Sequence, residues 1–127
     1  GLESGFMIAQ VAAASLLNEA RVLAHPASSD NITTSGGKED HVSMGMTGAL
    51  KLRSMVDLAE NLVAIELLTA AEGLEHRRPL KAGVGVERAF AALRKIAPPL
   101  MQDRPLSGDI ARVAEAIRQG EFDSSAN

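Results

Sequence analysis

Residues 42–72 read VSMGMTGALKLRSMVDLAENLVAIELLTAAE, and their apolar side chains fall on more than one face of a helix. The pattern predicts a helix of about thirty residues that begins near Glu39 or His41 and ends at about Glu72, with Gly73 as its C-cap. A helix that is apolar nearly all round is surrounded by protein. Because one chain of 127 residues cannot cover it completely, we expect contacts with other copies or with further domains along it.

The composition supports helices throughout the chain, which is long enough for one domain with a sizeable core. It contains 21 Ala and 15 Leu, whereas its aromatic residues are three Phe, with no Tyr and no Trp. Small and straight-chain residues favour close-packed helices, whereas a sheet would want β-branched and aromatic side chains. We therefore predict an all-α fold, in which long central helices pack as a helical bundle with smaller C-terminal helices.

Three further helices are expected, over Gly5–Ala24, Val86–Ala97 and Asp109–Gln119. Ser107 or Asp109 is the predicted N-cap of the last helix, and Gly120 is its predicted C-cap. These elements place one helical region over residues 1–120, and we expect residues 121–127 to form a frayed tail.

Composition also excludes several classes of function. The absence of Cys excludes disulfides and thiolate chemistry and is compatible with the cytoplasm. A net charge of -3 offers no basic surface for nucleic acid. The longest apolar stretches are interrupted by Glu19, Glu60 and Glu66, so we expect no membrane span. The first residue is Gly1 rather than Met, and we therefore expect the chain to begin inside a longer protein.

The segment that could carry chemistry follows a loop of about a dozen residues, 27–39, that is rich in Ser, Thr, Asn and Gly. There a glycine pair precedes Lys38, Glu39, Asp40 and His41. A carboxylate beside an imidazole can form an acid/base pair when both are desolvated. On spacing alone, a first helical turn is the favoured interpretation, because Glu39 and Asp40 would complement the helix dipole there.

Two other polar features favour structural roles. His25, His41 and His76 lie 16 and 35 positions apart, whereas a zinc site commonly pairs ligands at a fixed short spacing, so we expect no metal site. The run of residues 75–78, Glu-His-Arg-Arg, could hold an anion, but a solvated helix end is the favoured interpretation.

Four segments closely resemble the C-terminal part of histidine ammonia-lyases in order and spacing: GFMIAQV at 5–11, LAHPAS at 23–28, EDHVSM at 39–44 and LVAIE at 62–66. The similarity extends more weakly through residues 82–119. The segment EDHVSM is the discriminating one, because the phenylalanine and tyrosine relatives typically carry Asn-Gln-Asp and a different continuation there.

This resemblance implies a mostly helical, homotetrameric, cytoplasmic lyase that removes ammonia from L-histidine to give urocanate. The implied electrophile is a methylidene-imidazolone (MIO) group, which forms by cyclisation of an Ala-Ser-Gly tripeptide. This sequence contains no Ala-Ser-Gly and none of the tyrosines that such enzymes use as acid/base groups. We therefore expect a C-terminal fragment that is inactive alone, with the MIO group in the missing N-terminal part and no cofactor in this chain.

Residue by residue, Glu39 matches the active-site glutamate of the family, which lies near the substrate imidazole as a base or a ring-binding group. Lys38, Asp40 and His41 are expected to support the substrate loop. Gly37 and Lys38 stand where the family often has Asn-Gln, which leaves room for another aromatic amino acid as substrate of a lyase or an aminomutase. A third hypothesis is a helical oligomerisation module without chemistry.

Overall fold

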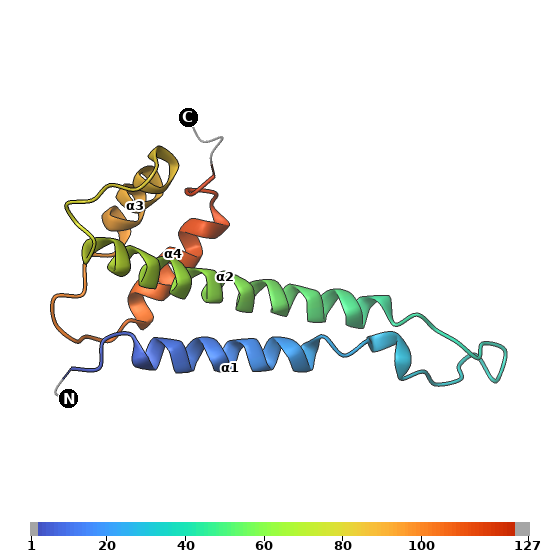
Figure 1. The fold of residues 1–127 in the computed structure, drawn as a ribbon. Coiled ribbons are helices and arrows are strands. Elements are labelled where there is room, and N and C mark those ends of the chain that lie inside the picture. The colour runs from blue at the N-terminus through green and yellow to red at the C-terminus, as the bar shows by residue number, and fades with distance from the viewer. Residues whose placement is uncertain (1–2, 124–127) are drawn as a thin grey trace.

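The computed structural model describes residues 3–123, and the predicted all-α architecture is confirmed (Figure 1). The elements are α1 (Met7–Leu23), a short 3-10 helix η1 (Ala27–Ser29), α2 (Gly45–Glu75), α3 (Val84–Ile96) and α4 (Ser107–Arg118). Within this range, none of the helices is both long and apolar enough to cross a membrane.

The two long helices form an antiparallel hairpin, and the two short helices pack around one end of it (Figure 1). Residues 10–63 include no buried side chain, and we call this part of the hairpin the arm. We call residues 3–9 and 64–123 the head, because all of the buried residues lie there. The far end of the arm is the tip loop, residues 24–44, which connects α1 to α2.

The head has a core of small and medium-sized side chains from three helices. Its buried members are Ala64, Leu68, Ala71, Leu93, Ala97, Val113 and Ala114. Alanines on α2 let α3 and α4 approach closely, and partly buried aromatic rings, Phe6, Phe90 and Phe122, close the edges of the cluster. The head therefore has the close packing of a protein interior.

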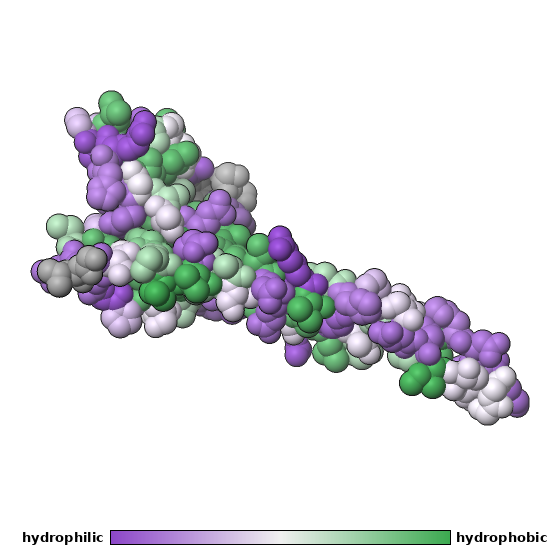
Figure 2. Space-filling model, turned by 60° about the horizontal axis from the view of Figure 1, so that its bottom comes forward, coloured by the Kyte–Doolittle hydropathy of each residue, from purple (hydrophilic) through white to green (hydrophobic). Residues whose placement is uncertain are grey.

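The arm instead exposes apolar side chains on both helices. Figure 2 shows apolar patches between polar ones along the arm. Val22 is 69% exposed, Met46 75% and Leu52 60%. Exposed apolar surface of this extent typically marks an interaction site. This exposure agrees with the prediction that one chain cannot completely cover α2.

Two boundaries of α2 differ from the prediction. The helix begins at Gly45, after Met44 in the left-handed conformation (φ 51°), rather than near Glu39 or His41. It also continues through Gly73 to Glu75, so Gly73 is not the C-cap. A glycine inside a helix costs only about 1 kcal/mol, which favourable contacts on either side can outweigh.

The other helices lie within two residues of their predicted ends. Neither Ser107 nor Asp109 is the N-cap of α4, since the helix begins at Ser107 and its N-cap residue is Leu106, without a side-chain bond. The C-cap residue of α4 is Gln119 rather than Gly120. Gly120 follows it with φ 75°, the left-handed conformation expected just after a helix end. Phe122 then packs against the core, whereas residues 124–127 of the predicted tail lie outside the described residues.

Candidate functional site

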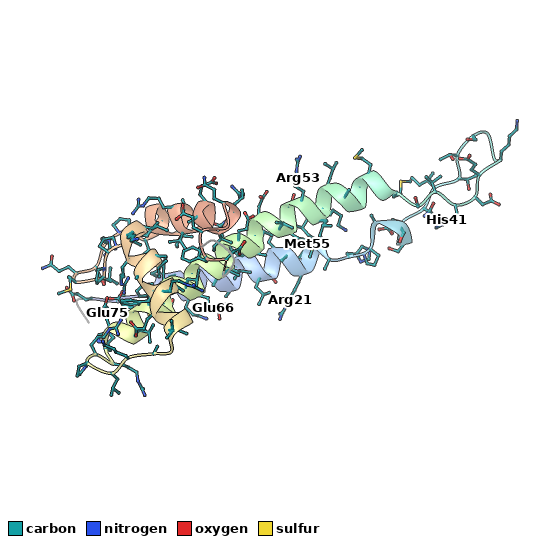
Figure 3. All side chains as sticks on the ribbon, turned by 90° about the horizontal axis from the view of Figure 1, so that it is seen from above. Arg21, His41, Arg53, Met55, Glu66 and Glu75 are labelled. Atoms are coloured by element: carbon teal, nitrogen blue, oxygen red, sulfur yellow. The ribbon has the colours of Figure 1, made fainter. Side chains whose placement is uncertain are left out.

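The candidate catalytic segment lies in the tip loop, at the opposite end of the hairpin from the head. Figure 3 shows His41 beyond the start of α2, far along the arm from Glu75. Lys38, Glu39, Asp40 and His41 are all exposed. The first-turn interpretation of Glu39 and Asp40 is wrong, because α2 begins four residues after His41 and has no acidic residue in its first turn.

Glu39 is instead held in a tight turn by Thr34. The Thr34 N–H donates to the Glu39 carbonyl at 2.9 Å, and the Glu39 N–H donates to the Thr34 carbonyl at 3.4 Å. The Thr34 hydroxyl also donates to the Glu39 carboxylate at 3.1 Å. Between them, Ser35, Gly36 and Gly37 all have positive φ, which the two glycines adopt without a steric cost because they have no Cβ.

Further bonds attach this turn to the rest of the arm. The Val42 N–H donates to the Asn31 amide oxygen, and the Asn31 amide nitrogen donates to the Ser28 carbonyl at 2.9 Å. At the base of the loop, the Lys51 ammonium on α2 donates to the His25 carbonyl. The loop is therefore anchored on both sides, although most of its side chains are exposed.

The histidines do not come together. His25 lies just after α1, with its Nε2 3.2 Å from Ser29 Oγ and 3.4 Å from Asp30 Oδ2, and His76 is the C-cap residue of α2. Within residues 3–123, no three His, Asp or Glu side chains are grouped so that they could hold a metal ion.

The run of residues 75–78 is engaged in ion pairs of the head. Arg94 lies 2.9 Å from Glu75 and 3.0 Å from Glu72, and the Leu100 N–H donates to Glu72 at 3.0 Å. These contacts fix the last turns of α2 against α3. Sequence reasoning missed them, because the partners lie 19 to 28 positions apart.

Arg78 likewise has a partner and offers no open anion site. It makes a bidentate pair with Glu87, at 2.8 and 3.0 Å, and its guanidinium stacks over the Phe90 ring at 4.6 Å. The hydrogen bond from Arg78, and a second one from the Ala82 N–H, lower the pKa of Glu87. The same bond with Glu87 raises the pKa of Arg78.

A further polar contact joins the segment before α1 to the loop between α3 and α4. The Asp103 carboxylate accepts the N–H groups of Ser4 and Gly5, at 2.5 and 3.0 Å. Beside it is an open apolar cavity of about 530 Å³ between the start of α1 and α4, lined in part by Ile8 and Ile110. Both belong to the head, whereas Glu39 lies at the tip of the arm.

Comparison with known proteins shows which family the chain resembles. The family model for aromatic amino acid lyases matches residues 1–95. A histidine ammonia-lyase of Sorangium cellulosum is 54% identical over 94% of this chain, which corresponds to 23% of that protein.

Solved structures agree with the sequence relatives. The chain superposes on a histidine ammonia-lyase of Trypanosoma cruzi with a TM-score of 0.91 and 43% identity, over 96% of this chain and 24% of that one. It superposes on a tyrosine aminomutase of Streptomyces globisporus with a TM-score of 0.90 and 33% identity, over 96% of this chain and 23% of that one. The chain spans about a quarter of the length of these relatives, and it belongs to the aromatic amino acid lyase family.

Proposed function

We propose that this chain is the C-terminal helical region of a lyase that eliminates ammonia from L-histidine to give urocanate. The observation that carries the proposal is the 54% identity with a histidine ammonia-lyase over nearly the whole chain. Among the superposed structures, the identity is 43% with a histidine ammonia-lyase and 33% with a tyrosine aminomutase. The segment EDHVSM at residues 39–44 adds to it. We call the longer protein that would contain this chain the parent. It would act in the cytoplasm, in agreement with the absence of Cys.

In this proposal the chain supplies part of an active site and cannot act alone. The MIO electrophile of the family would polarise the substrate for loss of ammonia. No residues here can form it, since the sequence has no Ala-Ser-Gly tripeptide. The chain also has no Tyr to serve as an acid/base group. We therefore expect no urocanate from L-histidine with the 127-residue chain by itself.

Glu39 is the residue that we assign to substrate. A carboxylate can accept a hydrogen bond from an imidazole N–H, or take a proton from the substrate when the surrounding protein excludes water. Glu39 is exposed in this chain, so the rest of the parent would have to cover it. Lys38, Asp40 and His41 would support the loop from adjacent positions and set its charge.

The arm provides the surface for that covering. Its exposed apolar side chains would be buried by other copies of the chain or by the remainder of the parent, in a homo-oligomer such as the tetramer of the family. Assembly of this kind would also shield the tip loop from water, which a carboxylate needs if it is to act as a base.

The test is Glu39→Gln in the full-length parent, followed by urocanate absorbance with L-histidine as substrate. The amide keeps the size of the side chain and removes its charge and basicity, so we expect turnover to fall about a hundredfold or more. Glu121→Gln, an exposed carboxylate in the head, is the matched control and should change nothing. Unchanged turnover in Glu39→Gln would remove Glu39 from the site.

A second candidate is a lyase or aminomutase for another aromatic amino acid, and Lys38 in place of a neutral amide is the observation that favours it. The product discriminates the two, because an aminomutase gives a β-amino acid without net loss of ammonia. A non-catalytic module remains the third candidate, and absence of an Ala-Ser-Gly tripeptide in the full-length parent would support it.

A further inference from the structure

The turn at the end of the tip loop places one hydroxyl beside the candidate catalytic carboxylate. Thr34 and Glu39 form an isolated antiparallel bridge, joined by backbone hydrogen bonds in both directions. Side chains of two directly opposed residues lie on the same face of such a pair. The Thr34 hydroxyl consequently reaches the Glu39 carboxylate at 3.1 Å.

This bond leaves the two carboxylate oxygens of Glu39 unequal. Oε2 accepts the Thr34 hydroxyl, whereas Oε1 accepts no hydrogen bond from any residue between 3 and 123. Because Glu39 is exposed in this chain, Oε1 is the oxygen open to an incoming N–H donor. The carboxylate is thus occupied on one side and available on the other.

The hydrogen bond between the Thr34 and Glu39 side chains contributes little to the stability of the turn. The turn is already closed by the backbone bonds between Thr34 and Glu39, and by the bond from the Gly37 N–H to the Thr34 carbonyl at 3.1 Å. A hydrogen bond at an exposed site adds little to folding, because water competes for both groups. Its larger effect is on orientation, because an unrestrained Glu side chain samples many rotamers.

We infer that Thr34 is a positioning residue for Glu39, an inference that rests on the catalytic role proposed above for Glu39. The branched Thr34 side chain is stiff at χ1, so its hydroxyl is a fixed point for Oε2. Holding Oε2 aims Oε1 at the imidazole N–H of the substrate, or at the proton to be removed. Thr34 acts through Glu39 and does not itself touch the substrate.

The experiment compares variants of the full-length parent by kcat and KM for L-histidine. Thr34→Val keeps the branched shape and removes the hydroxyl, and Thr34→Ala does so with a smaller group if Thr34→Val fails to fold. Thr34→Ser keeps the hydroxyl. Thr33→Val is the matched control, since Thr33 is the exposed neighbouring threonine whose hydroxyl bonds no residue in the described part of the chain.

We expect Thr34→Val and Thr34→Ala to lower kcat/KM about tenfold or more, since a hydrogen bond to a charged group is lost. Thr34→Ser should stay within about threefold of the parent, as should Thr33→Val. In a Glu39→Gln background, Thr34→Val should have little further effect, because the group that it orients is already disabled. Rescue by serine and loss of additivity are readouts that a merely structural role would not give.

Three outcomes distinguish failure of this inference from failure of the proposed role of Glu39. If Glu39→Gln abolishes turnover but Thr34→Val leaves it intact, the positioning role is overturned and the role of Glu39 stands. An equal fall on adding Thr34→Val to Glu39→Gln would likewise overturn the inference, because the two residues would act independently. If Glu39→Gln itself leaves turnover intact, the catalytic role of Glu39 fails and the inference fails with it.

Discussion

The two long helices run through both the head and the arm, yet the two regions bury very different amounts of side chain. In the head, α2 is covered by α3 and α4, and Ala64 and Val113 are fully buried. In the arm, α2 contacts α1 and the short helix η1, so nothing between residues 10 and 63 is buried. The difference teaches that contacts within the described residues are enough to bury the core of the head, whereas they leave the arm without a buried residue.

The largest expected difference between the two regions is in the free energy of unfolding after a leucine is replaced by alanine in each. Leu93→Ala in the head removes a side chain that is 2% exposed and leaves a cavity, so it should lower the free energy of unfolding by about 4 kcal/mol. Leu52→Ala in the arm should change it by less than about 0.5 kcal/mol. Denaturant unfolding of the chain measures both.

The arm variant has a second readout, self-association. Leu52→Ala should weaken association of the chain in sedimentation velocity, whereas Leu93→Ala should not do so while it stays folded. A clean monomer of the unmodified chain would contradict covering of the arm by other copies of this chain. Equal loss of stability in both variants would remove the distinction between the two regions.

The next effect concerns the ion pairs of the head. Arg94 is 12% exposed in its side chain and lies between Glu72 and Glu75, so Arg94→Ala should lower the free energy of unfolding by about 3 kcal/mol. Arg53→Ala is the control on the arm, where an exposed arginine should matter little. A similar loss in both variants, measured by thermal unfolding, would show that burial does not set the cost.

The smallest effect is a pH dependence at the edge of the head. Because Arg78 and the Ala82 N–H lower the pKa of Glu87, the ionised form of Glu87 stabilises the fold above its ordinary pKa. That contribution should be lost as the pH falls through the lowered pKa of Glu87. Glu87→Gln should therefore flatten the acid side of a plot of stability against pH, while Glu121→Gln, which is exposed, should leave the curve unchanged.

Local signals in the sequence were enough for the helices and for the loop in which the candidate site lies. Apolar periodicity predicts all four α-helices, and the glycine pair with the four polar residues after it locates the tip loop. The predicted start of α2 was wrong because Met44 adopts a left-handed conformation that no local pattern announces. Its predicted end was wrong because Gly73 resembles a C-cap, while contacts of Glu72 and Glu75 with Arg94 lie on either side of it.

What the sequence could not provide are contacts between distant positions. Asp103 bonds residues 98 and 99 positions away, and nothing near it in the sequence points to Gly5 or Ser4. The Arg118 pair with Asp57 on α2 also joins positions far apart in the chain. Thr34 is different, because it lies only five positions from Glu39, and a threonine before a glycine turn could have suggested the bond.

Because α2 is one continuous helix, a small tilt at its head end displaces the tip loop at its other end. Its 31 residues correspond to a rod of about 45 Å, held by the head at one end and leading to the tip loop at the other. A tilt of about 2° at the held end would displace the far end by roughly 1.5 Å. Misplacement on the order of 1 Å can cost a catalytic site about a hundredfold in rate. If Glu39 has the role proposed above, substitutions in the head would therefore slow turnover of the parent by displacing a site that they never touch.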